Sequence, residues 1–68
     1  MSNIEYFIED QTVVHRKLII VNSSKEDKLL KVLNQGELLK IVMIPKNTEK
    51  ELIFEHLKVE DLEILEIK

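Results

Sequence analysis

Apolar and polar residues alternate near the start of the chain, as they do in a strand that buries one face. Within residues 3–9, Ile4, Tyr6 and Ile8 fall on one side, while the other side carries two glutamates and a phenylalanine. This pattern predicts a half-exposed strand at the edge of a sheet. Residues 10–12 are polar and are expected to form a turn before the next apolar segment.

Three further segments predict strands. Residues 13–21 are rich in β-branched side chains and end in a continuous apolar run, which predicts a strand whose second half lies in the sheet interior. Residues 38–44 are almost entirely apolar and stop at Pro45, which has no N–H to donate to a ladder. Residues 62–67 carry apolar side chains on both faces and predict the last strand.

Two segments between these strands have the signature of helix starts. In each, a serine or threonine stands three residues before a glutamate, which is the spacing of a capping box. The pairs are Ser23 with Glu26 and Thr48 with Glu51. Apolar residues at helical spacing follow the first pair, and Gly36 stands where a glycine ends a helix. The pattern predicts helices over residues 23–35 and 49–58.

The first of these helices has an alternative. The same part of the chain fits a β-hairpin, with strands at residues 28–33 and 37–44 and a turn at 34–36. In that case the chain would form a small all-β barrel with five strands, of the SH3 or Sm type.

Taken in order, the elements predict an α/β fold for a single small domain, residues 1–68. The order is ββαβαβ, which gives a four-stranded mixed sheet with two helices on one face, a small two-layer sandwich. Strand–helix–strand crossovers are right-handed, so the last three strands are expected to be mutually parallel. The other sheet face is apolar but uncovered, and we therefore expect a second copy of the chain to cover it in a homodimer.

The composition limits what the chain binds. The 68 residues carry a net charge of -3, and 44% of them are hydrophobic but only 4% aromatic, which predicts an aliphatic core. The chain has no cysteine for a disulfide or a thiolate metal site, and no apolar stretch long enough to span a membrane. We expect a cytoplasmic protein whose partner is a protein rather than a nucleic acid, because a strongly basic segment is missing.

Two loops of the predicted fold suit an anion. In an α/β sheet, ligands bind beyond the carboxyl ends of the parallel strands, where helices begin and present free N–H groups. The candidate anion-binding or ligand-binding residues are Ser23, Ser24, Lys25, Lys46, Asn47 and Thr48. The alternative is that these residues only cap the helices.

A second group of residues is a candidate protein-binding surface. It combines apolar side chains on the uncovered sheet face with acidic residues from the last third of the chain, which suit a basic partner. These residues are Ile19, Val21, Glu60, Asp61, Glu63 and Glu66. His15 and His56 lack neighbours at the spacing of metal ligands, so we predict no metal, no cofactor and no catalytic residues.

The stretch over residues 40–67 resembles swapped-hairpin domains of the AbrB/MazE type. It shares with them a strand ending in Ile44-Pro45, a predicted short helix, and a return segment that starts at Leu57 and leads into a strand. The resemblance implies an intertwined homodimer that binds DNA as a repressor or antitoxin. The family's basic hairpin before the Ile-Pro strand is here Gly-Glu-Leu-Leu, at residues 36–39.

These observations favour a non-enzymatic protein-interaction module over an enzyme. The abundance of lysine, isoleucine and asparagine, with one glycine and one proline, is typical of AT-rich genomes and suits a phage or mobile element. In such settings short chains often act as inhibitors or regulators by binding a protein. The alternatives are a DNA-binding dimeric regulator or antitoxin, and a small anion-binding protein.

Overall fold

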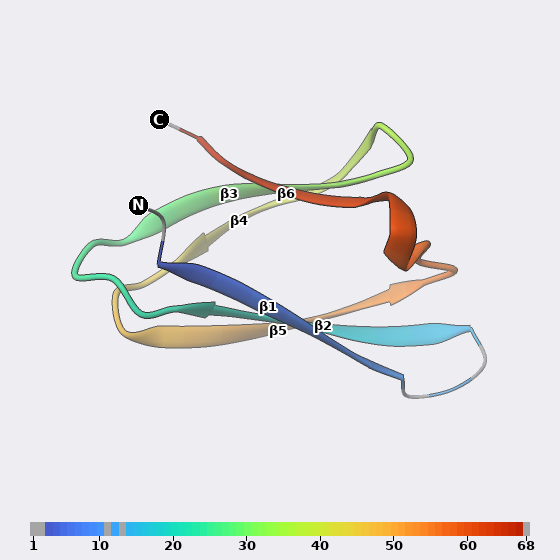
Figure 1. The fold of residues 1–68 in the computed structure, drawn as a ribbon, viewed down its shortest axis with the longest axis horizontal. Coiled ribbons are helices and arrows are strands. Elements are labelled where there is room, and N and C mark those ends of the chain that lie inside the picture. Colours follow the sequence, from blue (N-terminus) through green and yellow to red (C-terminus); the bar gives the residue numbers. More distant parts are fainter. Residues whose placement is uncertain (1–2, 11, 13, 68) are drawn as a thin grey trace.

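The computed structural model describes residues 3–10, 12 and 14–67, which form two antiparallel three-stranded sheets (Figure 1). The strand orders are β1-β2-β5 and β4-β3-β6, and Figure 1 shows one sheet stacked on the other. The first sheet consists of β1 (Ile4–Asp10), β2 (His15–Asn22) and β5 (Thr48–Glu55). The second consists of β4 (Glu37–Ile44), β3 (Lys28–Asn34) and β6 (Leu62–Glu66), which follows a short 3₁₀ turn, η1 (Val59–Asp61).

The predicted α/β architecture is wrong. Most of the first segment predicted to be helical is strand β3, and most of the second is strand β5. Every strand pairing among the described residues is antiparallel, so the expected parallel crossovers are wrong as well. A second sheet takes the place of the two helices that the sequence predicted on one face.

Strand β3 carries apolar side chains on both of its faces. Leu30 and Val32 point into the core and are 1% and 0% exposed, while Leu29 and Leu33 alternate with them and point outward. Four apolar residues placed in this way fit the stripe of a helix as well as a strand with two apolar faces. The hydrophobic pattern alone therefore does not distinguish the two.

The turn at Gln35 and Gly36 completes the alternative hairpin. Both residues have positive φ values, 55° and 76°, as the two central residues of a type I′ turn do. β3 and β4 then pair along their lengths, with one shift of register after Val32. The glycine serves a hairpin turn and not the end of a helix.

The threonine of the second predicted capping box also belongs to a turn. The Thr48 hydroxyl donates to the carbonyl oxygen of Pro45, and Asn47 has a φ of 53°, so the chain changes direction between β4 and β5. β5 then pairs with β2 along its whole length and places Leu52 in the core.

The core lies between the two sheets and is aliphatic, as the composition predicts. Its buried side chains come from both sheets and are Leu18, Ile20, Leu30, Val32, Val42, Ile44 and Leu52. Partly buried side chains from β1, β5 and β6 pack around this cluster. Because a strand buries alternate residues, the residues between them form an outer face on each sheet.

The other strands lie close to where the sequence predicts them. β1 is an edge strand and β2 is central in its sheet, as expected. β4 and β6 match the strands predicted at residues 38–44 and 62–67 to within one residue. The predicted turn at 10–12 includes Gln11, and the second predicted strand begins at Val13; both residues lie outside the described part of the chain.

The two alternative folds also differ from the structure. The swapped-hairpin resemblance implies a short helix after Pro45, but residues 48–55 form β5 and pair with β2 of the same chain. The five-stranded barrel shares the hairpin over residues 28–44, whereas the described residues form six strands in two sheets.

Candidate functional site

The outer face of the β4-β3-β6 sheet is apolar. Residues that point away from the core alternate with the buried ones, and in this sheet most of them are large and aliphatic. Six of them form the surface that we call the apolar face: Leu29, Leu33, Leu38, Ile41, Met43 and Leu65. All but the half-buried Leu33 are 41% to 52% exposed. A contiguous exposed patch of this kind is typical of an interaction surface.

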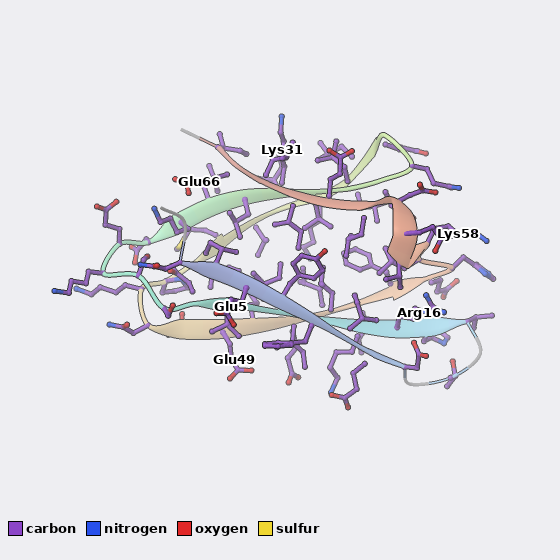
Figure 2. All side chains as sticks on the ribbon, in the orientation of Figure 1. Glu5, Arg16, Lys31, Glu49, Lys58 and Glu66 are labelled. Atoms are coloured by element: carbon purple, nitrogen blue, oxygen red, sulfur yellow. The ribbon has the colours of Figure 1, made fainter. Side chains whose placement is uncertain are left out.

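Lys31 stands at the centre of the apolar face. Ile41 of β4 and Leu65 of β6 lie directly opposite it on either side, and Leu29 and Leu33 are its neighbours along β3. Lys31 is half-buried, so its aliphatic stem lies among these side chains while its ammonium group reaches solvent. Figure 2 shows it pointing away from the core.

Glu63 is the one acidic residue of β4, β3 and β6 whose place in the register puts it on this face. It lies opposite Leu33, one step diagonally from Lys31. Among the described residues, neither Lys31 nor Glu63 has an oppositely charged group within the 4.0 Å limit of an ion pair. The face therefore presents one positive and one negative charge, each free to meet a partner.

Strand β4 forms an open edge beside the apolar face. It is the end strand of its sheet, and six of its eight residues are exposed. An edge strand offers unpaired N–H and C=O groups to another chain, and proteins usually guard such strands with charges or proline. In β4 the interior charge is Lys40, and Pro45 follows only after the strand has ended.

The outer face of the other sheet is mixed: it carries the apolar side chains of Phe7, Ile19, Val21 and Ile53 together with a group of acidic residues. Five glutamates from β1 and β5 point outward from it: Glu5, Glu9, Glu49, Glu51 and Glu55. Lys17 pairs with Glu51 at 3.7 Å, and Nε2 of His15 lies 3.3 Å from the Glu55 carboxylate. We call this surface the acidic face; Figure 2 shows Glu49 on it, directed away from Lys31.

The structure brings the two predicted anion-binding loops together but leaves few of their groups free. The Ser24 hydroxyl donates to the side-chain oxygen of Asn22 at 2.6 Å, and the Ser23 hydroxyl donates to the carbonyl oxygen of Asn3 at 3.1 Å. The backbone N–H of Lys46 donates to the Asp27 carboxylate at 2.9 Å. The helix N-termini expected here are strands and turns, so no helix dipole favours an anion.

A shallow pocket of about 240 Å³ lies beside these loops. Ser23, Asn47 and Thr48 line it together with Glu49, whose carboxylate repels an anion. Lys25 and Lys46 are exposed but do not line it. Of the six predicted residues, the structure thus gathers three around one pocket.

The predicted protein-binding residues do not form one surface. Ile19 and Val21 lie on the acidic face, whereas Glu63 lies on the apolar face. Glu60 and Asp61 belong to η1. Glu66 lies opposite Leu30 in the register and pairs with Lys28 at 3.4 Å. The structure therefore divides these residues among several places, and their role in binding a partner stays a prediction.

A second pocket, of about 250 Å³, is lined in part by Arg16, His56, Lys58 and Glu60. The Arg16 guanidinium is already engaged, since it pairs with Asp10 at 3.0 Å and donates to the carbonyl oxygen of Leu57 at 3.3 Å. The described residues contain no group of three or more histidine and acidic side chains that could hold a metal ion.

Sequence reasoning missed two buried asparagines that organise the loops. Asn22 is 0% exposed and Asn34 is 8% exposed. Asn34 donates to the carbonyl oxygen of Lys58 at 2.7 Å and accepts the Lys58 N–H at 3.0 Å, which fixes the approach to η1. An asparagine at the end of an apolar run was the available signal for each.

No protein-family model, curated protein or solved structure matches this chain. In the described residues, no helix is long and apolar enough to cross a membrane. The two outer faces are the features of the molecule that bear most on its function.

Proposed function

We propose that the chain is a non-enzymatic protein-interaction module and that it binds its partner through the apolar face. The observation that carries this proposal is the set of six aliphatic side chains around Lys31 on one sheet surface. Completing the burial of a half-exposed aliphatic side chain yields about 1 kcal/mol, so the six together would contribute roughly 5 kcal/mol to association. A gain of this size supports a specific but modest affinity once the entropy of association is subtracted.

The distribution of charge favours a protein partner over a nucleic acid. The acidic face would repel a phosphate backbone, and the apolar face carries Lys31 as its one cation. DNA binding through several phosphates requires several cations on one surface and shows a steep dependence on salt. A protein surface with apolar side chains and a carboxylate complements the apolar face better.

A module of this kind acts by occupying a surface of another polypeptide. We propose that it works in the cytoplasm as a regulator or inhibitor, which an amino-acid composition typical of AT-rich genomes also suits. The proposal assigns the interaction to β3, β4 and β6 and leaves the acidic face outward.

Photo-crosslinking tests the proposal directly. A photoreactive amino acid replaces Met43 on the apolar face, and in a matched variant it replaces Glu51 on the acidic face. Irradiation of cells that express each variant should give a discrete crosslinked polypeptide from position 43 and little from position 51. Equal crosslinking from both positions, or none from position 43, would overturn the proposal.

A further inference from the structure

We infer that the partner of the apolar face is a second copy of this chain, packed face to face so that Lys31 of each copy meets Glu63 of the other. This inference rests on the proposed function and names the occupant of the same surface. Three features of the face support it: its charges, their placement, and the residues between them.

The charges of the face are self-complementary. By register, β3 contributes Lys31, β6 contributes Glu63, and the remaining outward residues of the three strands are aliphatic. A two-fold interface brings residue i of one copy to residue j of the other and residue j to residue i. One lysine and one glutamate on one face are the smallest set of charges that such symmetry satisfies twice.

Both groups lack an ionic partner within the described part of their own chain. Covering an unpaired charge with apolar surface is costly, whereas covering it together with an opposite charge offsets much of that cost. An apolar partner without charges would leave Lys31 uncompensated. A second copy supplies the carboxylate that Lys31 needs and the ammonium that Glu63 needs.

The placement of the two residues selects one alignment. Lys31 and Glu63 lie diagonally across a block of four residues whose other two members are Leu33 and Leu65. A two-fold axis through Lys31 would bring two ammonium groups together, which is unfavourable. An axis running near Leu33 and Leu65 instead pairs each ammonium with a carboxylate and places these leucines against their own counterparts. β3 and β6 then form the centre of the interface, and β4 lies at its rim.

The size of the apolar face limits the expected affinity of the dimer. It is built from three strands of five to eight residues, so the interface is expected to bury at most the standard area of about 800 Å² per partner. We therefore expect a dimer that dissociates on dilution. The acidic face stays outside this interface and keeps neighbouring dimers apart through its charge.

Charge reversal tests the inference through the variants K31E and E63K. Each single variant carries two like charges on the face and should dissociate at least about tenfold more readily than the unchanged chain, the factor that corresponds to about 1.4 kcal/mol. The two variants mixed in equal amounts should form a heterodimer, because one supplies two glutamates and the other two lysines. The double variant K31E/E63K should dimerise like the unchanged chain.

Native mass spectrometry and light scattering over a dilution series measure these states, and far-ultraviolet circular dichroism confirms that each variant is folded. The control is E51K on the acidic face, which should leave dimerisation unchanged. Single variants that dimerise like the unchanged chain, or a mixture that stays monomeric, would overturn the inference. A monomeric unchanged chain that still crosslinks another polypeptide from position 43 would overturn the inference and leave the proposed function intact.

Discussion

The side-chain amide of Asn22 donates a hydrogen bond of 2.9 Å to the carbonyl oxygen of Ile44 and so joins the end of β2 in one sheet to the end of β4 in the other. The same amide donates to the carbonyl oxygen of Glu26 at 2.9 Å, and its oxygen accepts the N–H of Ser24 at 3.0 Å. The amide also donates to the carbonyl oxygen of Pro45 at 3.3 Å, so one fully buried side chain binds the backbone of both the β2–β3 and the β4–β5 connection.

We expect Asn22→Ala to lower the free energy of unfolding by about 2–4 kcal/mol, because several buried groups lose their hydrogen-bond partner at once. Urea unfolding followed by circular dichroism measures the change. Ser23→Ala is the matched control: its exposed hydroxyl donates to the carbonyl oxygen of Asn3, and we expect a loss below about 1 kcal/mol. Similar losses in the two variants would contradict this role of Asn22.

Asn34 is expected to hold the segment before β6 in place. Asn34→Ala leaves the N–H and carbonyl groups of Lys58 without this partner, so we expect a loss of about 1–3 kcal/mol and faster amide exchange at Lys58. Asn34→Asp keeps the acceptor and loses the donor, and its effect should be intermediate. Hydrogen exchange measures both. Unchanged exchange at Lys58 in the alanine variant would argue against this account.

A substitution in the hairpin turn between β3 and β4 should stabilise the fold. Gln35 has a φ of 55°, a left-handed conformation that asparagine tolerates better, and Asn-Gly is the favoured pair in a type I′ turn. Gln35→Asn should therefore raise the stability by about 0.5 kcal/mol, and Gln35→Ala should not. Thermal unfolding of the two variants checks the sign. A gain in the alanine variant alone would show that backbone conformation does not limit this turn.

Substitutions at two neighbouring residues of β4 should affect folding and association separately. Val42 is 5% exposed in the core and Ile41 is 52% exposed on the apolar face. Val42→Thr buries a hydroxyl and should cost about 1–3 kcal/mol of stability. Ile41→Thr keeps a β-branched side chain and should change the stability of the dilute chain by no more than about 0.5 kcal/mol while weakening association. Urea unfolding and the dilution series provide the two readouts, and unchanged association of Ile41→Thr would count against the apolar face.

Sequence patterns identified the strands whose two faces differ or whose ends are marked. β1 alternates clearly, and Pro45 marks the end of β4, so both were predicted near their observed bounds. β3 was predicted as a helix because Leu29 and Leu33 add outward apolar residues to the inward ones. Apolar side chains on both faces make β3 a candidate for interaction, since association and the core each require an apolar face. The same side chains remove the alternation of apolar and polar residues that predicts a strand.

The candidate site was predicted less well than the strands. The anion-binding hypothesis depends on helix N-termini, and it loses its electrostatic basis because neither capping-box residue starts a helix: the Ser23 hydroxyl donates to the carbonyl oxygen of Asn3, and the Thr48 hydroxyl donates to that of Pro45. The sequence assigns Ile19 and Glu63 to one candidate surface, but a strand's face depends on the register of its neighbours, which single-sequence patterns do not specify. The sequence predicts an uncovered apolar face on the single sheet of an α/β fold. In the structure, the exposed apolar face belongs to the β4-β3-β6 sheet.

Thiol labelling of the apolar face gives the most direct test of this account. The chain has no cysteine, so Leu65→Cys near the proposed axis and Ile53→Cys on the opposite face each introduce a single reactive thiol. We measure the labelling rate of each variant across a dilution series. A face-to-face dimer should protect Leu65→Cys as the protein concentration rises, while Ile53→Cys should react at a constant rate. Equal, concentration-independent labelling of both thiols would show that the apolar face stays uncovered and would contradict the account.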